Sequence, residues 1–176
     1  MSSIKNLKKF ISIFSFVFLS FVISAQADTF KIEAPKNWKV VNGLFGMPYS
    51  ILGPNINSQG RSVITVNKVT EEDFPFKFFE KHKYFESYKK SKQKWADKTG
   101  NEIIRFFQDD LENLKNFNKK YNTGVSYIKN GKGFMEKNFY LSCNKKLYIL
   151  KYLMPLINRT EDLVFIEKSI GSFRCD

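Results

Sequence analysis

The residue types that most often carry out chemistry in proteins are scarce in this sequence. His82 is the only histidine among 176 residues, so a cluster of histidine metal ligands is excluded and any catalytic triad would depend on this one residue. It falls at the edge of the apolar face of a predicted helix, where an ordinary helix histidine is the favoured interpretation. Histidine-based catalysis therefore has no support in the sequence.

Two short acidic runs are the remaining candidates for binding a cation. One is Glu71, Glu72 and Asp73, and the other is Asp109 with Asp110. Adjacent carboxylates point in different directions on most backbones, and no calcium-loop spacing surrounds either run. We interpret both runs as helix-capping residues and expect neither a metal nor a cofactor.

The first 27 residues are typical of a secretory signal peptide. Lysines precede an apolar run over residues 10–23, and Ala25-Gln26-Ala27 fits the small-x-small cleavage pattern. The alternative is an uncut membrane anchor, but the apolar run is shorter than the roughly 20 residues that span a bilayer. Cleavage after Ala27 would leave one domain, residues 28–176, with a net charge of +9 and a periplasmic or secreted location.

Cys143 and Cys175 are the only cysteines. Export to an oxidising compartment favours a structural disulfide between them, which would stabilise the fold by roughly 3–4 kcal/mol on the chain-entropy model. The alternatives are a metal pair or a redox couple. The two residues lie far apart in the sequence, no C-x-x-C motif occurs, and a single histidine makes a poor metal set. We therefore expect the disulfide.

The elements that would position these residues form an α+β domain. Segments rich in alternating or β-branched residues predict strands. A short helix or an irregular connection fits residues 108–120. The Asn130-Gly131 dipeptide marks a hairpin, because both central positions of such a turn need positive φ. The predicted strands are 30–32, 38–41, 49–52, 61–69, 103–107, 121–129, 133–143 and 147–154.

Two helices are expected around this sheet. The first begins near Thr70, follows an apolar stripe to about Trp95, and stops at Gly100. Thr160 is the expected N-cap of the second, whose apolar residues fall on one side: Leu163, Ile166, Ile170 and Phe173. The lysines of the first helix that fall opposite its apolar stripe are Lys83, Lys90 and Lys94; Lys81, Lys89 and Lys92 lie near the seam, where long stems can reach water.

Positive charge and phenylalanine are the features that could serve binding. A basic domain attracts anionic surfaces, although lysine-rich composition over a solvated surface is the simpler interpretation. Lysine orients a bound anion only weakly compared with arginine. The run FPFKFFE (residues 74–80) holds more rings than one helical face can bury, so we expect Phe76 or Phe79 at a contact surface.

Scattered features of the chain resemble the PsbP-like αβα sandwich, the fold of the extrinsic PsbP protein of photosystem II. They are an early Pro35-x-x-Trp38, the strand pattern Arg61-x-x-Ile64-x-Val66, a lysine- and tyrosine-rich helix ending near a tryptophan, Tyr-Ile-Leu-Lys-Tyr at residues 148–152, and a terminal Ser172-Phe173. A nuclear-import factor that binds the Ran GTPase shares this fold. The resemblance implies a non-enzymatic accessory or binding role, and it transfers neither a partner nor a site residue.

The leading hypothesis is an exported accessory protein that presents a basic surface to an anionic partner, either an envelope surface or a protein. Peripheral membrane contact is compatible with it, and nucleic acid is the least favoured partner. One alternative is a small envelope hydrolase with a serine, lysine and carboxylate site. Another is a structural envelope component that self-associates through a large apolar patch.

Overall fold

The computed structural model describes residues 30–42, 48–55, 60–70, 81–109, 111, 114, 117, 119–143 and 146–175. The predicted signal peptide, with its cleavage site, and the rings of Phe76 and Phe79 lie outside these residues, as do Glu71, Glu72 and Asp73. Within the described part of the chain, neither helix is long and apolar enough to cross a membrane.

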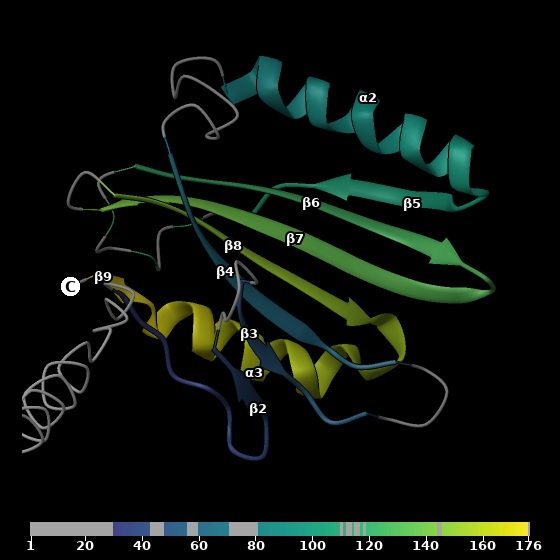
Figure 1. The fold of residues 1–176 in the computed structure, drawn as a ribbon. Coiled ribbons are helices and arrows are strands. Elements are labelled where there is room, and N and C mark those ends of the chain that lie inside the picture. Colours follow the sequence, from purple (N-terminus) through teal and green to yellow (C-terminus); the bar gives the residue numbers. More distant parts are fainter. Residues whose placement is uncertain are drawn as a thin grey trace, which may run out of the picture.

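The centre of the molecule is a seven-stranded sheet in which every neighbouring pair is antiparallel (Figure 1). Its strand order is β2-β3-β4-β8-β7-β6-β5. The three long strands form one continuous meander, as the sequence predicts. The strands are β2 (Lys39–Val41), β3 (Tyr49–Leu52), β4 (Val63–Val69), β5 (Glu102–Phe107), β6 (Lys119–Lys129), β7 (Lys132–Cys143) and β8 (Lys146–Pro155).

The β6–β7 hairpin confirms the turn prediction. Asn130 and Gly131 have φ angles of 50° and 70°, the left-handed backbone that a two-residue hairpin turn requires. Lys129 pairs with Lys132 across this turn, and the register then continues without a break to Lys119 opposite Ser142. This hairpin fixes which side chains of β7 face each side of the sheet.

One helix covers each face of the sheet (Figure 1). Helix α2 (Lys81–Thr99) follows β4 and lies over β5 and β6. Helix α3 (Arg159–Ser172) follows β8 through the short 3₁₀ turn η3 (Leu156–Asn158) and lies on the opposite face. A two-stranded ribbon of β1 (Phe30–Lys31) and β9 (Arg174–Cys175) joins the two ends of the domain. This arrangement is the predicted αβα sandwich.

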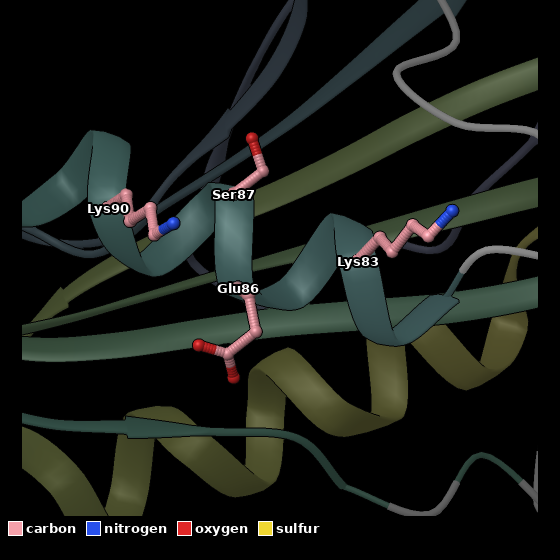
Figure 2. A pocket seen from close by; sticks show the side chains of 4 residues that line it. All are labelled: Lys83, Glu86, Ser87 and Lys90. Atoms are coloured by element: carbon pink, nitrogen blue, oxygen red, sulfur yellow. The ribbon is translucent and has the colours of Figure 1, made fainter.

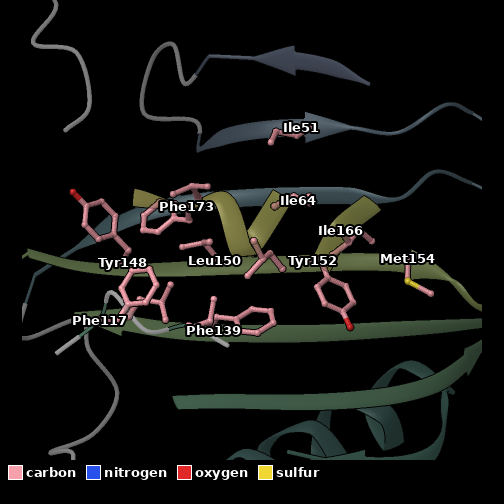
Figure 3. Close-up of a cluster of buried hydrophobic side chains, with 14 of the residues drawn as sticks. Ile51, Ile64, Phe117, Phe139, Tyr148, Leu150, Tyr152, Met154, Ile166 and Phe173 are labelled. Atoms are coloured by element: carbon pink, nitrogen blue, oxygen red, sulfur yellow. The ribbon is translucent and has the colours of Figure 1, made fainter. Parts of the chain in front are cut away.

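The main hydrophobic core lies between the sheet and α3 (Figure 3). Phe173 is fully buried, and its ring packs 5.5 Å from that of Phe30, 5.3 Å from Tyr148 and 5.9 Å from Phe117 between centroids. Ile166 of α3 is likewise fully buried. The predicted face of the last helix therefore packs as expected.

Polar bonds hold both ends of α3. Near its start, the buried Ser62 hydroxyl donates a hydrogen bond to the Asp162 carboxylate. Near its end, the Glu33 backbone N–H donates to the Ser172 hydroxyl at 2.8 Å. The helix begins at Arg159, so Thr160 stands one residue inside it rather than at the cap.

Three other predictions receive a mixed outcome. The first helix ends at Thr99, and Gly100 has the positive φ of 66° that terminates helices. Thr70 is described, but residues 71–80, over which the helix was predicted to begin, lie outside the described residues. Asp109 does not cap a helix: its backbone N–H donates to the Asn122 side chain at 3.0 Å, and its carboxylate pairs with Lys137. The capping interpretation of Asp109 was therefore wrong, because a partner on β7 determines its role.

Candidate binding surface on helix α2

Aromatic side chains fix the inner face of α2 on the sheet. Tyr84 packs edge-on against Tyr140 of β7, with ring centroids 5.4 Å apart, and the two hydroxyl oxygens lie 2.7 Å apart. Farther along the helix, Trp95 packs edge-on against Tyr127 of β6 at 5.0 Å. These residues are separated by three helical turns, so α2 is held along most of its length.

A buried ionic cluster supplements the aromatic contacts. Glu136 of β7 is 6% exposed, and its two carboxylate oxygens accept separate ammonium partners. Lys92 Nζ of α2 lies 2.7 Å from Oε1, and Lys151 Nζ of β8 lies 3.1 Å from Oε2. The cluster links the helix to two strands, and each oxygen of the carboxylate has its own lysine partner.

The charge state of Glu136 follows from this geometry. Burial alone would raise the pKa of its carboxyl, but the positive charges of Lys151 and Lys92 outweigh burial and lower the pKa below its ordinary value. Glu136 is therefore ionised at neutral pH. A paired, ionised carboxylate is a positioning group and a poor proton donor.

The surrounding tyrosines are poor acids because burial raises the pKa of their hydroxyl groups. Burial raises the pKa of Tyr121 to about 12, and burial together with the negative charge of Glu136 raises the pKa of Tyr127 to about 12. Burial also raises the pKa of Tyr88, whose hydroxyl has no hydrogen-bond partner among the described residues. These phenols stay neutral and act as hydrogen-bonding and packing groups.

The outer face of α2 carries the lysines that the sequence singled out. Lys83, Lys90 and Lys94 are all exposed. Helix α2 as a whole holds seven lysines against two acidic residues. Because one face is bound to the sheet, Lys83, Lys90 and Lys94 direct positive charge away from it, whereas Lys92 points inward to Glu136.

A shallow hollow of about 450 Å³ lies along this outer face and is lined by Lys83, Glu86, Ser87 and Lys90 (Figure 2). Glu86 forms an ion pair with Lys89, in which Oε1 lies 2.6 Å from Nζ. Figure 2 shows the Glu86 carboxylate pointing away from Ser87. The lining is thus cationic at both ends.

The hollow contains the residue types of the predicted hydrolase alternative but not its geometry. A serine nucleophile needs a base within hydrogen-bonding distance and a site that excludes water. Ser87 is exposed, and the carboxylate among the lining residues, that of Glu86, is paired with Lys89. The arrangement can attract an anion, and among the described residues no base forms a hydrogen bond with the Ser87 hydroxyl.

A second cleft, of about 290 Å³, lies on the α3 side. Its described lining residues are Asp109, Leu111, Leu114, Lys137, Phe139, Glu167, Ile170 and Gly171. Lys137 pairs with Asp109 and lies 4.7 Å above the Phe139 ring, so its charge is already partnered. No hydroxyl, thiol or imidazole occurs among these described lining residues.

The remaining predicted residues are placed only in part. The backbone of His82 lies in the first turn of α2. Cys143 ends β7, two residues beyond the fully buried Leu141, and Cys175 of β9 packs on the same core. The disulfide between them stays a prediction. No group of three His, Cys, Asp or Glu side chains suited to a metal occurs in the part of the chain that the structure describes.

Sequence reasoning missed the residues that orient α2. Lys92 was placed at the seam of the helix, whereas it points inward to Glu136. A signal was present in β7. Every second residue of this central strand faces the same side of the sheet, and on the α2 side these residues are Phe134, Glu136, Asn138 and Tyr140. A carboxylate at such a position must find a cation, and the inward lysine supplies it.

Comparison with known proteins identifies the fold. No protein-family model matches the sequence, and no curated protein sequence matches it. The Ran-binding protein Mog1p of Saccharomyces cerevisiae has a similar structure, with a TM-score of 0.51 and 6% identity over 84% of this chain and 90% of Mog1p.

Two bacterial structures are also similar at lower scores. LpqN, involved in cell envelope biogenesis of Mycobacterium tuberculosis, has a TM-score of 0.47 with 15% identity over 82% of this chain and 81% of its own. The cyanobacterial PsbP (CyanoP) of Synechocystis sp. PCC 6803 has a TM-score of 0.44 with 11% identity over 86% and 89%. The fold that the chain shares with Mog1p is the PsbP-like αβα sandwich that its sequence resembles.

Proposed function

We propose that this protein is an exported, non-enzymatic binding protein that holds an anionic partner on the outer face of α2. The observation that carries the proposal is the division of α2 into two faces. One face is fixed to the sheet by Tyr84, Trp95 and the Glu136 cluster, and the other presents Lys83, Lys90 and Lys94 to solvent. A rigid support keeps the three ammonium groups on one stripe of the surface.

The chemistry of this surface favours electrostatic attachment over recognition of one small molecule. The hollow is shallow, and lysine ammonium groups are hydrated point charges with little directional preference. Attachment of this kind acts at long range and weakens as salt screens the charges. The matching partner is an extended anionic surface, such as an envelope surface or an acidic protein face.

The test is retention of the mature chain, residues 28–176, on immobilised envelope extract over a range of salt concentrations. We expect retention to fall steadily as ionic strength rises. The triple variant Lys83→Glu, Lys90→Glu and Lys94→Glu should weaken binding by roughly 100-fold at low salt, since each lysine near an anionic surface contributes about 1 kcal/mol.

A matched variant controls for net charge. Lys36, Lys39 and Lys129 are also exposed but lie outside α2. Their replacement by glutamate changes the total charge by the same amount and should leave most of the binding intact. Retention that is independent of salt, or equal loss in the two triple variants, would show that the α2 surface is not the binding site.

A further inference from the structure

The outer face of α3 carries apolar side chains that the fold does not use. Ile157, Val164 and Phe165 are 68%, 62% and 45% exposed, and they account for three of the five large hydrophobic residues exposed in the described part of the chain. They follow one another along the same side of η3 and α3, opposite the buried Ile166 and Ile170. A stripe of this kind is costly in water unless another surface covers it.

Two charged residues lie on the same stripe. Glu161 stands one turn before the apolar pair and Lys168 one turn after it, and both are exposed. At 100° per residue they share nearly the same angular position, and Val164 and Phe165 flank them on either side. Neither charge takes part in an ion pair between described residues.

The order of these residues is symmetric about the midpoint between Val164 and Phe165. Reversing the helix about that point exchanges Glu161 with Lys168 and Val164 with Phe165. A second copy of α3 in antiparallel orientation would therefore place Glu161 against Lys168 of the partner subunit, twice, around an apolar centre. A parallel copy would instead place like charges together.

We propose that the protein self-associates through α3 as a two-fold symmetric, antiparallel helix pair. Such an interface is isologous: both subunits contribute the same patch, which must be complementary to itself. The α3 patch meets this requirement, because its charges and apolar side chains exchange places on reversal. The dimer also keeps the basic surfaces apart, because α2 lies on the face of the sheet opposite α3 (Figure 1). The self-association does not depend on what the outer face of α2 binds.

One helix pair is small compared with a standard interface of roughly 1,600 Å². We therefore expect a weak, reversible dimer whose population rises with protein concentration. Sedimentation velocity of the mature chain over a wide concentration range measures this directly.

Charge exchange supplies the specific test. Glu161→Lys or Lys168→Glu alone converts both attractive pairs into repulsive ones and should raise the dimer dissociation constant by at least about tenfold. The double variant Glu161→Lys with Lys168→Glu restores the complementarity in reverse and should return the constant to within about threefold of the original. Val164→Ser should weaken the dimer without affecting its charge pairing.

Each outcome decides the proposal. The three substituted side chains, Glu161, Val164 and Lys168, are exposed, so the unfolding curve of each variant should match that of the wild type. A wild-type chain that stays monomeric at its solubility limit overturns the proposal. A double variant as weak as the single variants, or a dimer that Val164→Ser leaves unchanged, places any self-association on another surface.

Discussion

The two faces of the sheet solve the same task, attachment of a helix, with different chemistry. On the α3 face, β7 contributes Met135, Phe139 and Leu141 to one continuous apolar core. On the α2 face, the alternate residues of the same strand include Glu136 and Tyr140, which bond to side chains of the helix. One strand thus contributes to an apolar core on one face and, on the other, to the polar junction with α2, which is formed by Glu136 and Tyr140 and their partners on the helix.

The difference separates the energy of folding from the placement of the binding surface. Burial of apolar area is strong but has no direction, so on the α3 face it stabilises the domain, and the polar bonds at the two ends of α3 supply the direction. Ion pairs and hydrogen bonds have defined geometry but yield little net stability after desolvation. We infer that the α2 face uses them to set the angle at which Lys83, Lys90 and Lys94 are presented.

Removal of a ring from the apolar face should have the largest effect on stability. Phe173 is fully buried against three other rings, so Phe173→Ala leaves a large cavity and should lower the free energy of unfolding by about 3–5 kcal/mol. Urea unfolding measures it. A loss below about 1.5 kcal/mol would mean that this core is not the main source of stability.

The predicted disulfide would strengthen the same face. β9 pairs Cys175 with Phe30, whose ring packs on Tyr148, and Tyr148 in turn pairs with Leu141 near the end of β7. This series of contacts brings the C-terminal strand toward Cys143. Replacement of both cysteines by serine should cost about 3 kcal/mol.

Thiol titration and unfolding with and without reductant check this prediction. The wild-type chain should show no reactive thiol until it is reduced, and reductant should not change the double serine variant. Two reactive thiols in the native protein would show that the bond is absent, and the cysteines would then no longer support an oxidising compartment.

Substitution in the polar junction should lower the free energy of unfolding by less than the loss of a core ring, and the loss should depend on pH. Glu136→Gln keeps the shape but leaves Lys92 and Lys151 without a carboxylate, and we expect a loss of about 2 kcal/mol, since both lysines are partly exposed. The pKa of Glu136 is lowered in the folded state, so its contribution is complete above the ordinary carboxyl pKa of about 4.3 and disappears as pH falls through the lower folded value.

The same substitution at an exposed pair is the control. Glu86 also accepts a lysine, but its side chain is 61% exposed. Glu86→Gln should therefore change stability by less than about 0.5 kcal/mol at any pH. If the two variants behave alike, the buried cluster does not hold α2 in place.

Sequence reasoning recovered the α3 face better than the α2 face, for a physical reason. The strands of the meander and the Asn130-Gly131 turn are local signals, readable from alternation and from the need for positive φ. The apolar side of the last helix follows from its 3.6-residue period. Both signals involve residues close together in the sequence.

The junction with α2 depends on pairs that are distant in the sequence. Nothing near Lys92 distinguishes it from Lys89, which lies 4.7 Å above the ring of Phe85 at the surface. Only the register of β7 against the helix selects Lys92 as the partner of Glu136. The pairing of β1 with β9 raises the same difficulty: the sequence predicts a strand at residues 30–32, but the two-residue strand β9 at the other end of the chain carries almost no pattern of its own.

The finest comparison is between two tyrosines on the α2 face. Tyr140 shares a hydrogen bond with Tyr84, whereas the hydroxyl of Tyr88 is buried with no partner among the described residues. Tyr140→Phe should cost about 1 kcal/mol, because the hydroxyl of Tyr84 then loses its partner. Tyr88→Phe should be neutral or stabilising, since it removes a polar group that burial penalises.

Chemical unfolding of the two single variants measures this difference, and each is the control for the other because both changes delete one oxygen from a buried ring. Equal losses would mean that the Tyr88 hydroxyl does have a bonding partner, such as the hydroxyl of Thr123. A cost confined to Tyr140→Phe would instead show that α2 is oriented by a few directed bonds, and that the rest of its contact with the sheet is apolar packing.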